Sequence, residues 1–263
     1  MTTASSNPVQ CFRIISVNFA YQLEAMLDRL HGLPASPPSL YLNITGLDHG
    51  SSATTLKMAI ASPQLSEIYT LNLDSLGHLI CSAHSSQNIT LKSVLESSTI
   101  TKVFFDGRQA SAALFNGYGI RLCQVHEIQM MELATRRDDH HKERLASWQK
   151  LIEQEQVVLP LWKKDSSTYF SDQRVLSLPQ LWSKYHRRLT VDGTAFWVAM
   201  VRQATKERLL STQPHDRTKN VLSSQSPWYE ELIQDERDTW NDDVCTQAWY
   251  PDYGMDYSIY RHL

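Results

Sequence analysis

The segment from Leu40 to Gly46 constrains the fold of this chain most, because two polar residues lie inside a short apolar run. A stretch rich in proline and serine, residues 34–39, precedes it. A bounded run of this kind is typical of a buried strand in the middle of a sheet. Asn43 and Thr45 lie two positions apart, so their side chains point to the same face of the strand. Because a buried polar group is costly without a partner, we expect this face to form a site.

The composition indicates one substantial core and an intracellular protein. The chain has 263 residues, 42% of them hydrophobic, and a net charge of −3. No long basic block is present, which disfavours nucleic acid as a partner. The four cysteines lie far apart without a CxxC pair, so we expect reduced, buried thiols and no zinc site. No signal peptide or membrane span is evident, and we expect a soluble cytoplasmic or nuclear protein.

Apolar spacing predicts strands and helices that alternate after an initial meander, which favours an α/β sheet of mixed direction. We expect strands at residues 11–17, 40–45, 56–61, 68–73, 102–106 and 121–125. We expect helices at residues 21–30, 90–96, 110–115 and 126–137, and an apolar helical stripe around Phe196 and Trp197 that belongs to the core.

The central strand resembles the first motif of the DEDD-type 3′-5′ exonucleases, in the branch that includes ribonuclease D. In that family the strand reads Tyr-x-Asp-x-Glu-Gly, and its two carboxylates hold paired magnesium ions. Here Asn43 stands in place of the Asp and Thr45 in place of the Glu. Later segments also resemble the sequences of this family, among them residues 91–97, 102–106, 131–134 and 178–182. The resemblance implies a ribonuclease H-like mixed sheet flanked by helices.

The same resemblance implies the domain limits and the remaining motif positions. A flexible leader (1–10), an exonuclease-like domain (11–213) and an aromatic-rich C-terminal extension (214–263) are expected. The second-motif Asp corresponds to Ala110. In an ungapped alignment of the third motif, Phe170 replaces the Tyr that orients water and Arg174 replaces the metal-binding Asp. A shifted alignment, with spacing one residue short, uses Tyr169 and Asp172 instead.

Metal-dependent hydrolysis is not expected from these residues. Two-metal catalysis needs anionic oxygen ligands around cations about 4 Å apart. Asn43 and Thr45 offer neutral oxygens, Ala110 offers none, and Arg174 would repel magnesium. We therefore expect no metal and no cofactor in this cleft.

Three further residues are candidates for the site, each with a simpler structural interpretation. Asp106 could pair with Arg174 or act as an acid or base, or it could only cap the next helix. Arg108 could bind a ligand or be a solvated turn residue. His126 is expected to open a helix, where a cap, a surface role or catalysis are all consistent with the sequence. The charged run at residues 136–144 is expected to be a solvated helix face.

Three functions remain open. The first is a metal-free enzyme that catalyses a cyclisation or a cycloaddition of a small, apolar, oxygenated molecule, of the kind found in fungal secondary metabolism. Its catalytic residues would be Arg174, Asn43, Thr45 and Asp106, and its ligand-binding residues Ala110, Phe170, Arg108 and His126. The second is a pseudo-exonuclease that binds RNA or a protein. The third is an active exonuclease with displaced ligands, built on Asp106, Asp172 and Asp48.

Overall fold

The computed structural model describes residues 13–46, 54–61, 66–137, 142–159, 169–211 and 224–249. In this part of the chain the strands form one mixed sheet in the order β1-β4-β3-β2-β5-β6. Their bounds are β1 Arg13–Val17, β2 Leu40–Thr45, β3 Thr55–Ala61, β4 Ser66–Asn72, β5 Lys102–Phe104 and β6 Val125–Glu127. The central strand β2 pairs antiparallel with β3 and parallel with β5, and β5 pairs parallel with β6.

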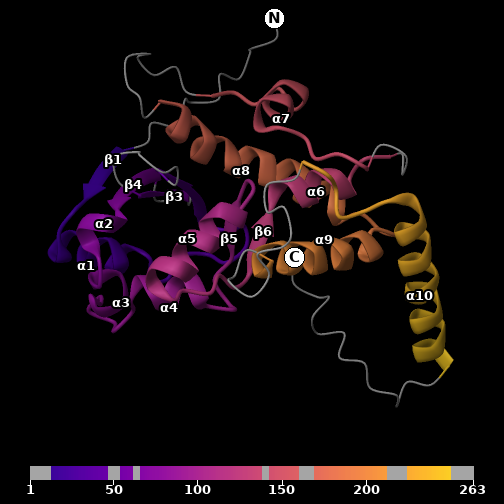
Figure 1. Ribbon diagram of the computed structural model, residues 1–263, viewed down its shortest axis with the longest axis horizontal. Helices are drawn as coiled ribbons and strands as arrows, with labels where there is room; N and C mark the ends of the chain where they lie inside the picture. The colour runs from indigo at the N-terminus through magenta and orange to yellow at the C-terminus, as the bar shows by residue number, and fades with distance from the viewer. Residues whose placement is uncertain are drawn as a thin grey trace, which may run out of the picture.

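Helices cover both faces of this sheet (Figure 1). Those of the first half are α1 Ala20–Arg29, α2 Leu73–Leu76, α3 Leu79–Ser82, α4 Leu91–Glu96 and α5 Arg108–Tyr118. Those of the second half are α6 Ile128–Ala134, α7 Trp148–Gln154, α8 Tyr169–Leu189, α9 Ala195–Leu210 and α10 Glu230–Trp249. No helix in the described ranges is long and apolar enough to cross a membrane.

The alternation of side chains along β2 separates two apolar clusters. Tyr41 belongs to a cluster with residues of α6, α8 and α9. Leu42, one position on, belongs to a second cluster with residues of α1, α4 and α5. Successive residues of a strand point to opposite faces, so β2 is buried on both sides. Asn43 and Thr45 have the same parity as Tyr41, and they therefore face the α8 side of the sheet.

Local signals explain where several elements begin and end. The Thr90 hydroxyl accepts a hydrogen bond from the backbone N–H of Ser93 at 3.0 Å, and the Ser93 hydroxyl bonds back, so α4 starts with a capping box. Helix α5 ends at Gly119, whose φ of 62° lies in the left-handed region that glycine adopts readily. The expected helices at residues 21–30, 90–96 and 110–115 are confirmed within a few residues.

The structure corrects the sequence interpretation around β6. A strand was expected at residues 121–125 and a helix from His126, but β6 spans Val125–Glu127 and α6 begins at Ile128. Lys102, Val103 and Phe104 of β5 pair in register with the three residues of β6. Pairing with β5 therefore makes this polar segment a strand, and the local sequence carries no signal for it.

The charged run and the aromatic extension also differ from a simple solvated surface. Lys142 lies within the run and is fully buried, so the expectation of a solvated face is wrong there; residues 138–141 lie outside the described part.

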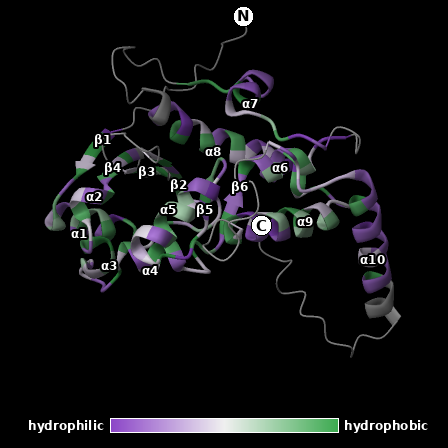
Figure 2. Cartoon of the chain, viewed as in Figure 1, coloured by the Kyte–Doolittle hydropathy of each residue, from purple (hydrophilic) through white to green (hydrophobic). Residues whose placement is uncertain are grey.

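In the extension, Trp228 packs against Trp197 and Trp240 against Phe196, with ring centroids 5.6 and 6.2 Å apart. Helix α10 is largely hydrophilic along its length (Figure 2). The described aromatic residues thus anchor the extension on α9.

Candidate functional site

A buried ion pair between β3 and α8 lies beside the face of β2 on which the site was predicted. Asn43 is 8% exposed and lies opposite Lys57 of β3 in the antiparallel register. Cross-strand partners project from the same face, so Lys57 lies beside Asn43 under α8. The ammonium of Lys57 donates a hydrogen bond to the carboxylate of Asp172, in the first turn of α8. The side chains of this pair are 3% and 9% exposed.

This ion pair distinguishes the two alignments of the third motif. Asp172 is buried and reaches the strand next to β2, whereas Arg174, two residues later on α8, is exposed. The structure thus brings the acid of the shifted alignment to the central strands and leaves Arg174 on the solvent side. The side chain of Phe170 lies outside the described residues. The catalytic role of Arg174 and the ligand-binding role of Phe170 stay predictions.

Ala110 and Thr45 contribute little to a metal site. Ala110 is 4% exposed and packs in the apolar cluster on the opposite side of the sheet from Tyr41. Thr45, at the end of β2, is partly exposed and has only a neutral hydroxyl. The segment that follows β2, including Asp48, lies outside the described residues.

Asp106 follows β5 and belongs to a network of charged side chains at the carboxyl ends of β5 and β6. Both carboxylate oxygens of Asp106 accept hydrogen bonds from Arg108, at 2.7 and 2.8 Å. Arg208 of α9 lies 3.4 Å from the same carboxylate. Burial opposes ionisation of Asp106, but the hydrogen bonds and charge of Arg108, with the charge of Arg208, lower its pKa overall. Arg108 is 9% exposed, so the expectation of a solvated turn residue is wrong.

Glu127 completes this network from β6. One of its oxygens accepts hydrogen bonds from the backbone N–H groups of Asp106 and Gln129, at 2.9 and 3.0 Å. Its second oxygen lies 3.6 Å from a nitrogen of Arg208 and has no hydrogen-bond partner. Burial raises the pKa of Glu127 despite the nearby Arg208 charge. The network joins α9 to the ends of two strands, and the two arginines flank the Asp106 carboxylate.

His126 lies inside the core on β6, so its expected position at a helix start is wrong. It is 7% exposed, and its Nδ1 accepts a hydrogen bond from Nε1 of Trp182 at 2.9 Å. Burial, followed by the charges of His186 and Arg202, lowers the pKa of His126 to about 4. The ring is therefore neutral at physiological pH and is enclosed between β6 and α8, where a ligand would have to displace core side chains.

The acidic residues in the described part of the chain do not fit a pair of magnesium ions. Nowhere in the described ranges do three or more His, Cys, Asp or Glu side chains gather as they would around a metal. Asp172 is already neutralised by an ammonium, and Asp106 by two guanidinium groups. An active exonuclease with displaced ligands would need Asp106 and Asp172 as metal ligands. A magnesium ion would first have to remove the cations that pair with them.

Sequence reasoning missed Lys57, although one signal for it was available. Lys57 stands between Leu56 and Met58 in the middle of an apolar strand, and all three are buried. A lysine in such a run must find a carboxylate or another acceptor. Its partner, Asp172, is 115 positions away, and a local sequence pattern cannot predict a contact at that separation.

Solved structures identify the architecture that holds this site. The structure of Trypanosoma brucei RNase D in complex with RNA U12 matches with a TM-score of 0.58 and 14% identity, covering 86% of this chain and 79% of that chain. The chain has the fold of ribonuclease D. The GMP complex of T. brucei RNase D matches with a TM-score of 0.57 and 15% identity, covering 81% of this chain and 67% of that chain.

Escherichia coli RNase D, described as an exoribonuclease involved in structured RNA processing, gives a TM-score of 0.52 at 10% identity. It covers 78% of this chain and 51% of that one. No protein-family model and no curated protein sequence matches the chain. The ribonuclease D fold agrees with the mixed sheet flanked by helices that the sequence resemblance implied. In this chain the Lys57–Asp172 pair joins β3 of that sheet to α8.

Proposed function

We propose that this protein is a pseudo-exonuclease that binds single-stranded RNA through the ribonuclease D fold without cleaving it. The observation that carries the proposal is the buried pair between Lys57 and Asp172 beside Asn43. A carboxylate site free of metal repels the phosphates of RNA. Here the motif positions hold a neutral amide, a hydroxyl and a methyl group, and the remaining acid is neutralised from within the chain. RNA binding should therefore need no divalent metal.

The likeness to the RNA-bound T. brucei structure supports RNA as the partner. The net charge of −3 opposes extensive contact with a phosphate backbone, so we expect weak binding limited to a short single strand. A cytoplasmic or nuclear location belongs to this proposal. The alternative is a pseudo-exonuclease that binds a protein, which would have the same fold but no affinity for RNA.

Fluorescence anisotropy with a labelled twelve-nucleotide oligouridine tests the proposal. We expect saturable binding that is the same in EDTA and in magnesium and that weakens as salt rises. The oligonucleotide should stay intact in magnesium and in manganese. Metal-dependent digestion would contradict the pseudo-exonuclease, and the absence of any binding at low salt would favour a protein partner.

A metal-free enzyme acting on a small, apolar, oxygenated molecule is the second candidate. Asn43 and Thr45 favour it, because both are uncharged hydrogen-bonding groups on one face of the central strand. Arg174, the third expected donor, is exposed, and its role stays a prediction. Turnover that survives complete chelation and is lost in Asn43→Ala would establish this function instead.

A further inference from the structure

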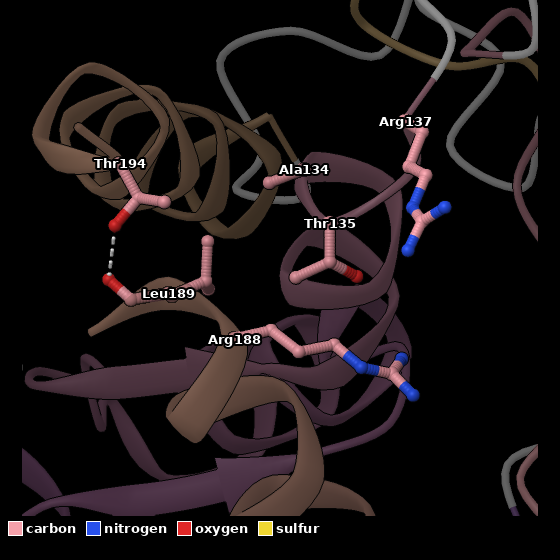
Figure 3. Close-up of a pocket in the computed structure, with 6 residues that line it drawn as sticks. All are labelled: Ala134, Thr135, Arg137, Arg188, Leu189 and Thr194. Atoms are coloured by element: carbon pink, nitrogen blue, oxygen red, sulfur yellow. Dashed lines mark hydrogen bonds between the residues drawn. The ribbon is translucent and has the colours of Figure 1, made fainter. Parts of the chain in front are cut away.

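A pocket of about 470 Å³ lies away from the ion pair on β3, where the ends of α6 and α8 meet the start of α9. Figure 3 shows its lining residues, which come from these three regions: Ala134, Thr135, Arg137, Arg188, Leu189 and Thr194. Such a volume is within the range of pockets that hold small ligands. No aspartate or glutamate is among the lining residues, so its charged groups are two arginines.

Arg188 is held in place from outside the pocket. Two of its nitrogens donate hydrogen bonds to the carboxylate of Glu155 at 2.7 and 2.8 Å, and its guanidinium lies 5.2 Å from the ring centroid of Tyr185. Its side chain is nevertheless 47% exposed. A guanidinium has five N–H donors, so this contact leaves donors for a ligand. Arg188 is thus oriented before any ligand arrives.

Two further cations, Lys184 and Arg137, lie near Arg188. Glu155 also lies 3.9 Å from the ammonium of Lys184, so one carboxylate is shared by two cations. Arg137 adds a further exposed guanidinium from the segment after α6, and in Figure 3 it extends to the same side of the pocket as Arg188. The N-cap residue of α9, Thr194, makes no side-chain capping bond to that helix, and its one hydroxyl proton is shared between the carbonyl oxygens of Leu189 and Val191. The positive end of α9 therefore adds to the field of the arginines.

We propose that this pocket binds a small phosphate-bearing molecule. Two guanidinium groups on separate segments can each donate paired hydrogen bonds to phosphate oxygens, and a volume of about 470 Å³ leaves room for an attached nucleoside or sugar. A neutral or cationic ligand would leave the excess positive charge unpaired. This site is distinct from the face of β2 and does not depend on RNA binding there.

Isothermal titration calorimetry on the full chain tests the proposal with adenosine 5′-monophosphate and inorganic pyrophosphate, with adenosine as the uncharged comparison. We expect both anions to bind saturably and adenosine not to bind. Arg137→Ala should lower the affinity for both anions by about tenfold or more, since it removes charge-assisted hydrogen bonds. Arg137 is exposed, so this variant should fold normally.

Arg187→Ala is the matched control, because Arg187 is an exposed arginine of α8 that does not line the pocket. It should change the affinity by less than about twofold, and Arg137→Ala should leave oligouridine binding unchanged. No saturable binding of either anion at low salt would overturn the proposal. So would unchanged affinity in Arg137→Ala, an equal loss in Arg187→Ala, or a parallel loss of RNA binding in Arg137→Ala.

Discussion

Lys57 of β3 and Asp172 of α8 form a buried ion pair across the face where exonucleases of this fold are expected to hold metal. Asn43 lies opposite Lys57 in the strand register, so the pair occupies the space next to the first-motif position. Breaking a buried pair costs much more than leaving it out, because the surviving charge has no partner.

Replacement of one partner should therefore destabilise the fold strongly. We expect Lys57→Ala to lower the free energy of unfolding by about 3–5 kcal/mol, measured by urea denaturation. The double variant Lys57→Met/Asp172→Leu should recover most of that loss, because it leaves no buried charge. A loss below about 1 kcal/mol in Lys57→Ala would show that Asp172 finds another partner or is open to water.

Restoring the two acids of the first motif should not by itself restore a metal site. In Asn43→Asp/Thr45→Glu, the ammonium of Lys57 still neutralises Asp172, and we expect no saturable manganese binding by calorimetry. Adding Lys57→Ala removes that cation, and manganese should then bind. Saturable binding with Lys57 in place would contradict the role given to this pair, whether or not oligouridine is digested.

The buried His126 should make stability depend on acid pH. Its pKa is about 4 in the fold and about 6.5 when unfolded, so the neutral ring is favoured by folding. Its contribution is complete above pH 6.5 and is lost as the pH falls towards 4. Between pH 7 and pH 4.5 we expect wild type to lose about 2–3 kcal/mol more than His126→Gln, which keeps an acceptor for Trp182.

Two exchanges serve as controls for this pH dependence. His31→Gln alters an exposed ring and should follow wild type. The pKa of His186, which stacks on Trp182 at 4.3 Å, is also lowered by burial, but this ring is only partly buried and its exchange should have a smaller effect. Equal pH profiles for wild type and His126→Gln would mean that His126 is protonated without cost.

Lys142 should contribute more to stability than its place in a charged run suggests. Its ammonium donates to the carbonyls of Leu133 and Arg136 at the end of α6 and lies 4.5 Å from the ring centroid of Trp197. Lys142→Met should lower the free energy of unfolding by about 2–4 kcal/mol, since buried carbonyls lose their donor. Lys150→Met, at an exposed position, should change it by less than about 0.5 kcal/mol. Similar losses in both variants would contradict this account.

The sequence predicts most of the sheet and little of the site. The strands β2 to β5 are short apolar runs bounded by turn residues, and their period is sufficient to place them. β6 was misplaced, because His126 and Glu127 have no strand preference and are ordered by pairing with β5. Local patterns report propensity and cannot report which strand supplies a partner.

The candidate site was predicted as a set of replaced motif positions, and the contacts between them were not. Asn43 lies on the expected face of β2, but the groups that decide its chemistry are Lys57 and Asp172. Their contact joins residues 115 positions apart, and it depends on where α8 crosses the sheet. The sequence left several roles open for Asp106. One of its partners, Arg208, lies 102 positions further along the chain.

The lysine on β3 also changes what the surroundings can do to the protein. A magnesium site fills and empties with the free metal concentration, and its charge follows. An ammonium attached covalently to the backbone stays at one per chain whether ions are scarce or abundant. The positive charge that Lys57 places beside Asn43 is therefore part of the polypeptide itself and does not depend on the supply of divalent ions.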